Sequence, residues 1–263
     1  MNKSFLFLMA FSSITLFFSC SSDDDDHGSQ YDAHRGIVKE NQEVDMGLTV
    51  EIDGKNYNVI FAMSNLTATG LAAKASDFGD YFAWAATEPW YTSYSLDSLG
   101  QPIADAWKES KSGGYDWTNV PYRDFSKDYS FSKYTQRGDV LEMTDDAAHV
   151  ILGGDWRLPT VEIWDELSDT TAFTWSLITL DGRNVCQVTS LSDNSKSLFL
   201  PAAGFFRDTI ANQVDSIGYY WSGTAFNVPG GWSMYFNDSS FFHFFGTRND
   251  GLSIRPVRLV EVK

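Results

Sequence analysis

Apolar and polar residues alternate along two short stretches, at residues 48–52 and 57–61, with Asp53-Gly54 between them. Alternation with a period of two is typical of a half-buried β-strand. An Asp-Gly pair favours the type I′ turn of a two-residue hairpin, which needs positive φ at both positions. The pattern therefore predicts a β-hairpin over residues 48–61.

Two helices are predicted in the middle of the chain. Thr144 is a candidate N-cap for the first, whose body covers residues 147–152 and which ends at Gly153. Thr160 is a candidate N-cap for the second, in which apolar residues three and four positions apart share one face (Val161, Trp164, Leu167).

The pattern of the C-terminal half is that of β-structure. Apolar runs bounded by Gly, Asn and Asp turns predict strands at residues 184–190, 197–203, 218–223, 232–238 and 252–260. Residues 78–140 combine many aromatic residues with Gly and Ser and show little periodicity, which predicts long loops with short strands. We find no internal repeat or break inside 44–263, so the sequence predicts one α+β domain there.

The N-terminus has the pattern of a secretory signal. Lys3 precedes an apolar run over 5–18 that is shorter than the ~20 residues of a membrane span. Residues 16–20 (LFFSC) resemble a lipobox, where bacterial lipoproteins are cut and acylated on cysteine. We therefore expect a lipoprotein signal peptide over 1–19 and a lipid on Cys20. A plain signal peptide with an incidental cysteine is the alternative.

Residues 20–43 are expected to form a polar tether after the acylated Cys20. The acidic run over 23–26 resembles the surface-export signal of Bacteroidota lipoproteins, and a solvated spacer is the alternative. The expected location is the outer membrane, on the cell surface, with membrane contact through the N-terminal lipid alone. The second cysteine, Cys186, lies in an alternating run and is expected to be a buried, free thiol.

The net charge of the chain argues against nucleic acid and anionic lipid as partners. The chain has 19 Lys and Arg against 35 Asp and Glu, a formal net charge of −16. A chain this acidic has little with which to form the basic patch of a nucleic-acid-binding protein, and anionic lipid repels it. Aromatic residues make up 16% of the chain, so they either fill the core or form a binding surface.

Five blocks of sequence carry a resemblance to a known family. They are residues 77–84 (DFGDYFAW), 153–160 (GGDWRLPT), 198–204 (LFLPAAG), 218–222 (GYYWS) and 253–258 (SIRPVR). In this order they resemble the Fibrobacter succinogenes major paralogous domain family over roughly residues 45–260. The resemblance implies a C-type lectin-like fold of the sulfatase-modifying-factor type, with two helices, a short antiparallel sheet and long loops.

This fold serves several functions, so the function must be argued from particular residues rather than from the fold. Formylglycine-generating relatives work through paired active-site cysteines, whereas the predicted domain has Cys186 alone. We therefore expect no catalytic residues, no metal and no cofactor. Calcium-dependent lectins carry Glu-Pro-Asn or Gln-Pro-Asp and a later Trp-Asn-Asp, and residues 88–90 (EPW) and 236–238 (FND) match these only in part. Metal-free carbohydrate binding through exposed rings remains open.

The segment 226–250 is the candidate binding face. Its Phe-Phe-His-Phe-Phe run is a poor strand and a poor loop, because alternate side chains of an extended chain point to opposite sides and some rings must be exposed. Rings among Ser, Gly and Asn are also typical of antibody loops. The expected ligand is a protein or glycan on another cell or a host surface, and the candidate residues are Trp232, Tyr235, Asn237, Phe241, Phe242, His243, Phe244, Phe245 and Asn249.

The same segment suggests a hypothesis about its origin. Most of its residue types can be reached from an AAC codon by changing only adenines. It thereby resembles the variable proteins of diversity-generating retroelements, which vary just before the C-terminal strand of a C-type lectin-like fold. An undiversified paralogue with a fixed binding face is the alternative.

Overall fold

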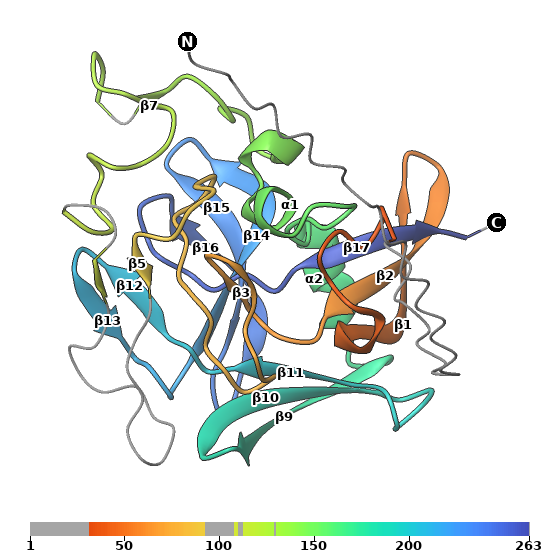
Figure 1. The fold of residues 1–263 in the computed structure, drawn as a ribbon. Helices are drawn as coiled ribbons and strands as arrows, with labels where there is room; N and C mark the ends of the chain where they lie inside the picture. The colour runs from red at the N-terminus through yellow and green to blue at the C-terminus, as the bar shows by residue number, and fades with distance from the viewer. Residues whose placement is uncertain (1–31, 93–107, 110–112, 129, 263) are drawn as a thin grey trace, which may run out of the picture. The chain divides into compact units, whose positions relative to one another are not determined.

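The first and last strands of the domain belong to one antiparallel sheet (Figure 1). The computed structural model describes residues 32–92, 108–109, 113–128 and 130–262. In this sheet β2 (Lys55–Ala62) lies between β1 (Glu43–Ile52) and β17 (Val257–Glu261). The predicted hairpin at 48–61 is confirmed, with Ile52 opposite Lys55 across the Asp53-Gly54 turn.

Two more three-stranded antiparallel sheets lie within the described residues. One has the order β11-β10-β9, built from β9 (Phe173–Leu180), β10 (Arg183–Ser190) and β11 (Ser197–Pro201). The other has the order β14-β15-β16, built from β14 (Gly218–Asn227), β15 (Gly230–Phe236) and β16 (Phe241–Thr247). β16 is therefore an edge strand of its sheet.

Short elements complete the described structure. Four two-stranded antiparallel pairs lie among the described residues. They are β3 (Leu66–Thr67) with β4 (Gly70–Leu71), β5 (Tyr91–Thr92) with β6 (Lys108–Glu109), β7 (Arg123–Asp124) with β8 (Ser130–Phe131), and β12 (Phe205–Arg207) with β13 (Ile210–Asn212). The helices are α1 (Ala147–Leu152) and α2 (Val161–Leu167), and 3₁₀ turns lie at Glu40–Gln42 and Met143–Asp145. With 44% strand and two α-helices, the described part of the chain is an α+β structure.

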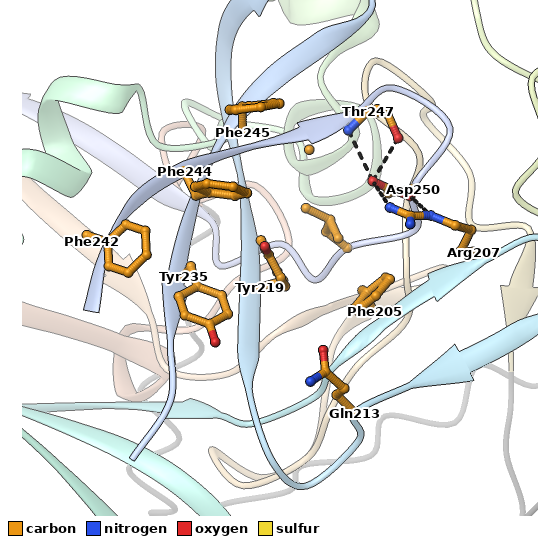
Figure 2. Close-up of a pocket in the computed structure, with 12 residues that line it drawn as sticks. Phe205, Arg207, Gln213, Tyr219, Tyr235, Phe242, Phe244, Phe245, Thr247 and Asp250 are labelled. Atoms are coloured by element: carbon orange, nitrogen blue, oxygen red, sulfur yellow. Dashed lines mark hydrogen bonds and ion pairs between the residues drawn. The ribbon is translucent and has the colours of Figure 1, made fainter. Parts of the chain in front are cut away.

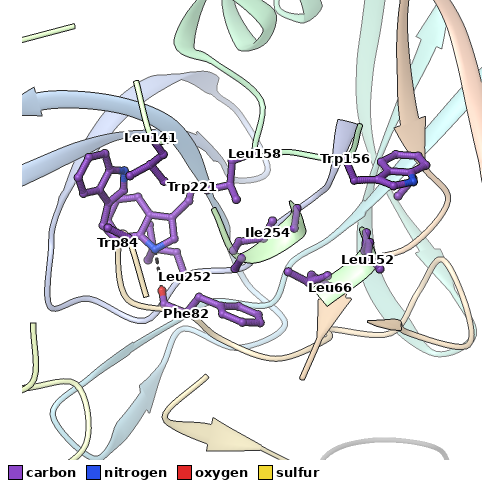
Figure 3. Packing of buried hydrophobic residues seen from close by; sticks show 14 of the residues in the cluster. Leu66, Phe82, Trp84, Leu141, Leu152, Trp156, Leu158, Trp221, Leu252 and Ile254 are labelled. Atoms are coloured by element: carbon purple, nitrogen blue, oxygen red, sulfur yellow. Dashed lines mark hydrogen bonds between the residues drawn. The ribbon is translucent and has the colours of Figure 1, made fainter. Parts of the chain in front are cut away.

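Tryptophan side chains fill the core. Trp84, Trp156 and Trp221 are fully buried in one cluster with Leu152 and Ile254 (Figure 3). Trp221 Nε1 donates to the Phe82 carbonyl oxygen at 2.7 Å, and Trp84 Nε1 to the Ser222 carbonyl oxygen at 2.9 Å. The indoles thus supply apolar volume and also satisfy buried backbone acceptors, as buried tryptophans must.

The cap of α1 differs from the prediction. Asp146, rather than Thr144, is the N-cap: its carboxylate accepts from the Ala148 and His149 amides at 2.9 and 3.3 Å. The same carboxylate accepts from the Leu158 amide at 2.8 Å, so it joins α1 to the segment before α2. Burial raises the pKa of Asp146 to about 6, against the effect of these three donors.

The folded unit also extends further toward the N-terminus than residue 44. Arg35 Nε donates to Glu43 at 2.9 Å, Trp156 Nε1 donates to the Arg35 carbonyl oxygen at 2.9 Å, and Val38 is buried. Residues 32–43, expected as the end of the tether, therefore pack against the domain. The expected signal peptide at 1–19, Cys20 and the start of the tether lie outside the described residues. No helix among the described residues has the length and apolar character of a membrane span.

Candidate functional site

The register of β14, β15 and β16 places a set of rings on one face of their sheet. Tyr219 on β14 pairs with Tyr235 on β15, which pairs with Phe242 on β16. Opposed residues of an antiparallel sheet point to the same side, and Phe244, two positions along β16, joins them. Ring centroids are 5.0 Å apart for Tyr219 and Tyr235 and 5.3 Å apart for Tyr235 and Phe242.

This face is hollowed (Figure 2). The cavity has a volume of about 460 Å³, which is within the roughly 300–1,000 Å³ of small-molecule sites. Its lining is mainly aromatic with a few polar groups, and we call it the aromatic hollow: Phe205, Arg207, Gln213, Tyr219, Tyr235, Phe242, Phe244, Phe245, Gly246, Thr247, Asp250 and Leu252.

Two pairs of rings in the aromatic hollow meet edge to face. Phe242 and Phe244 make an interplanar angle of 86° at 6.0 Å, and Phe205 and Tyr219 one of 75° at 5.7 Å. Such edge-to-face contacts fix each ring against its neighbour. Phe242 and Phe244 are nevertheless 45% and 39% exposed. The rings are thus held in place while their outer surfaces remain accessible.

An ion pair forms one side of the aromatic hollow. Arg207 Nε and Nη2 donate to the two carboxylate oxygens of Asp250 at 2.9 and 3.2 Å. Asp250 also accepts from the Thr247 amide at 3.0 Å and from its hydroxyl at 2.8 Å. The Asp250 side chain is 6% exposed and the Arg207 side chain 55% exposed. The carboxylate is therefore buried and held by four hydrogen bonds, whereas the guanidinium is exposed to solvent.

Two tyrosine hydroxyls add polar groups. Tyr235 Oη accepts from Asn237 Nδ2 at 3.0 Å, and its own proton remains to be donated. Tyr219 Oη has no hydrogen bond to the described part of the chain. Burial raises the pKa of Tyr219 to about 12, so this hydroxyl is neutral at physiological pH and can both donate and accept.

The opposite face of β16 carries a different cluster. His243 contacts the Trp232 ring edge-to-face at 5.0 Å, and its Nδ1 pairs with the Asp165 carboxylate of α2. The Arg137 guanidinium lies 5.0 Å from the Trp232 ring and 4.9 Å from the Phe226 ring. The His243 contacts attach the edge strand to β15 and to α2.

The nine candidate binding residues divide between these environments. Four line the aromatic hollow: Tyr235, Phe242, Phe244 and Phe245. Trp232 and His243 lie on the opposite face, and Phe241 stacks on Trp175 at 4.3 Å with an interplanar angle of 11°. The expectation that the Phe-Phe-His-Phe-Phe run makes a poor strand is wrong, because β16 pairs with β15 along its length and both of its faces find ring partners.

Two asparagines are placed away from the aromatic hollow. Asn237 shapes the β15–β16 turn, where its Oδ1 accepts from the Ser239 and Ser240 amides at 3.0 and 2.8 Å. Asn249 is buried and donates to the Tyr115 carbonyl oxygen at 3.2 Å, so it does not lie on the accessible face as expected.

Sequence reasoning missed the half of the aromatic hollow that comes from earlier in the chain. Phe205, Arg207 and Gln213 come from β12 and the segment after β13, outside the expected 226–250 segment. Tyr219 could have been found, because it alternates with the buried Tyr220 at the start of a predicted strand. Nothing in the sequence pairs Arg207 with Asp250.

The partial calcium motif has other roles. Trp90 is fully buried and stacks on Tyr115 at 5.1 Å, and the Asn237 oxygen is used in its own turn. The described residues include no cluster of three or more His, Cys, Asp or Glu side chains suited to a metal ion. Cys186 is a free, buried cysteine, and burial raises its pKa to about 12.

No protein-family model matches this chain, and no curated protein or solved structure shows significant similarity to it.

Proposed function

We propose that this protein is a surface lipoprotein whose C-type lectin-like domain binds a ligand without transforming it. The observation that carries the proposal is the aromatic hollow, in which rings from four strands line a cavity of about 460 Å³. Concave sites lined mainly by rings with a few fixed polar groups are typical of ligand-binding proteins.

Exposure of the rings supports binding over a purely structural role. Phe242, Phe244 and Phe245 are 45%, 39% and 40% exposed on one short strand. Leaving three phenylalanines on an edge strand is a liability, because exposed apolar edges promote aggregation. A ligand that covers the rings would remove that liability, and rigid aromatic anchors carry much of the energy at binding surfaces.

The polar groups of the aromatic hollow favour recognition rather than catalysis. Asp250 accepts four hydrogen bonds and its side chain is 6% exposed, so it is positioned as the partner of Arg207 and Thr247 rather than presented to a ligand. Gln213 and Thr247 are neutral, and the described lining of the cavity includes no histidine or cysteine. The remaining groups can orient a ligand through hydrogen bonds.

Substitution of two rings tests the binding proposal. The Phe242→Ala/Phe244→Ala double variant should lose ligands captured by the wild-type mature chain on glycan and protein arrays, with affinity falling at least about tenfold. Phe125→Ala is the matched control, since Phe125 is 68% exposed and does not line the aromatic hollow. Equal capture by the double variant and the wild type would contradict the proposal. Repeating capture in EDTA separates metal-free binding from the calcium-dependent alternative.

The lipid anchor is proposed from the sequence and needs its own test. Cys20→Ser should release the protein from membranes and abolish incorporation of labelled palmitate, while wild-type protein stays in the detergent phase. Protease accessibility in intact cells then distinguishes a surface lipoprotein from one that faces the periplasm.

A further inference from the structure

Arg207 has hydrogen-bonding capacity that the protein does not use. A guanidinium carries five N–H groups, and Arg207 directs one from Nε and one from Nη2 to Asp250. Its Nη1 has no hydrogen bond to the described residues. The edge formed by Nη1 and the second proton of Nη2 is therefore a free pair of parallel donors, which is the arrangement that binds a carboxylate.

The surroundings hold this free edge in place. The carboxylate of Asp250 accepts hydrogen bonds from the Nε–Nη2 edge of the guanidinium. The Phe205 ring centroid lies 5.4 Å from Arg207 Cζ. Asp250 balances the formal charge of Arg207, so the attraction of a ligand carboxylate to this place comes from the two free, parallel N–H donors rather than from a net positive charge. Arg207 is the only cationic side chain in the described lining of the aromatic hollow. The hydrogen bond to Asp250, and with smaller effects the charges of Asp250 and Asp208, raise the pKa of Arg207. Carboxylates further away are screened beyond about 8 Å at physiological salt.

The rest of the aromatic hollow suits a ring that carries hydroxyl groups. Tyr219 Oη is unpaired among the described residues, and Tyr235 Oη has a proton to donate. Gln213 lies at the rim near Phe205, across from Phe244 (Figure 2). A planar aromatic acid would use the rings and Arg207 but would leave these polar groups without partners, which disfavours it.

We propose that the aromatic hollow selects an acidic sugar, a pyranose ring that bears a carboxylate, such as a hexuronate residue of a glycan. The carboxylate lies on the Nη1–Nη2 edge of Arg207, the apolar face of the sugar lies against the rings of β15 and β16, and its hydroxyls bond to Tyr219, Tyr235 and Gln213. This inference rests on the proposed binding function and names its ligand class.

Titration calorimetry with matched trisaccharides tests the ligand class. The probes are trigalacturonate and its neutral counterpart galactotriose, with phenylacetate as a planar carboxylate that lacks hydroxyls. The wild-type mature chain should bind trigalacturonate at least about tenfold more tightly than either of the others. Equal or tighter binding of galactotriose or phenylacetate, or no binding of trigalacturonate at millimolar concentration, would overturn the inference.

Variants of Arg207 test the proposed contact. Arg207→Gln should abolish the preference for trigalacturonate, and Arg137→Gln should keep it, because Arg137 is an exposed arginine that stacks on rings outside the aromatic hollow. If Arg207→Gln fails to fold because Asp250 loses its partner, the Arg207→Gln/Asp250→Asn double variant removes both charges together. A preference that persists in a folded Arg207 variant contradicts the inference.

The two proposals fail in different ways. Binding of a neutral glycan or a protein that depends on Phe242 and Phe244 would leave the binding function standing and overturn the acidic-sugar assignment. If the Phe242→Ala/Phe244→Ala variant binds trigalacturonate as tightly as the wild type, the aromatic hollow is not the binding site, and both proposals fail.

Discussion

Phe241 and Phe242 are neighbours in the sequence and occupy opposite faces of β16. Phe241 stacks on Trp175 with ring centroids 4.3 Å apart. The Phe242 ring contacts the Tyr235 ring, with centroids 5.3 Å apart, and is 45% exposed. The strand's alternation thus assigns one ring to packing and the next to the aromatic hollow.

This division predicts that two alanine substitutions differ in their effects on stability and binding. Phe241→Ala should lower the free energy of unfolding by about 2 kcal/mol, because it leaves a void beside Trp175. Phe242→Ala should lower it by less than about 1 kcal/mol, because its ring is half exposed, while weakening ligand binding. Chemical denaturation of both variants measures the difference. Equal losses of stability would show that Phe242 is also a packing residue.

Cys186 should be protected from alkylation in the folded protein. Burial raises its pKa to about 12, so the thiolate that reacts is scarce at pH 8. Iodoacetamide should label it only after unfolding, as intact-mass spectrometry would show.

The same shift sets a pH dependence. Between pH 9 and 12 the unfolded chain releases the Cys186 proton and the folded chain keeps it, so stability falls as pH rises through this window. The limiting slope is about 1.4 kcal/mol per pH unit. Cys186→Ala should lack this part of the loss when both proteins are unfolded in denaturant at pH 8 and pH 10. Identical losses in the two proteins would contradict the assignment.

Gly246 should be essential for the placement of β16. A Cβ at this position would lie 2.6 Å from Trp221 Cη2, a buried ring that cannot move away. Gly246→Ala should therefore cost about 1–3 kcal/mol of stability, as overpacking does. It should also weaken ligand binding, since Gly246 lines the aromatic hollow. Thermal denaturation and ligand titration test the two effects together, and a variant with normal stability and affinity would refute this role.

If the segment 226–250 is diversified, its variation should follow exposure. Deep sequencing of the gene across a population should find substitutions at the first and second bases of codons 242–245, whose side chains are exposed. The codons of Met234, Phe236 and Arg248 should stay constant, because these side chains are buried. A uniform sequence would identify a binder of fixed specificity, and variation spread evenly over buried and exposed codons would contradict the hypothesis.

Local signals in the sequence predicted local structure well. The Asp53-Gly54 turn defined the first hairpin, and apolar spacing defined α2, because both depend on residues close together in the chain. β16 was missed as a strand because its rings do not alternate with polar residues. Two of its partners, Trp175 on β9 and Asp165 on α2, come from elements far away in the sequence.

The aromatic hollow was only half predictable for the same reason. Exposed rings in 226–250 followed from the geometry of an extended chain, whereas the Arg207–Asp250 pair joins residues 43 positions apart in sequence. Such a pair depends on how β12 meets the loop after β16, which a single sequence does not specify.

The pairing of β17 with β2 has a practical consequence for work with this domain. No residue that lines the aromatic hollow comes from β1, β2 or β17. A fluorophore or affinity tag attached beyond Glu261 therefore follows a strand that contributes no side chain to the cavity. Sensor surfaces can hold the domain by its C-terminal end with the cavity's own strands left unmodified.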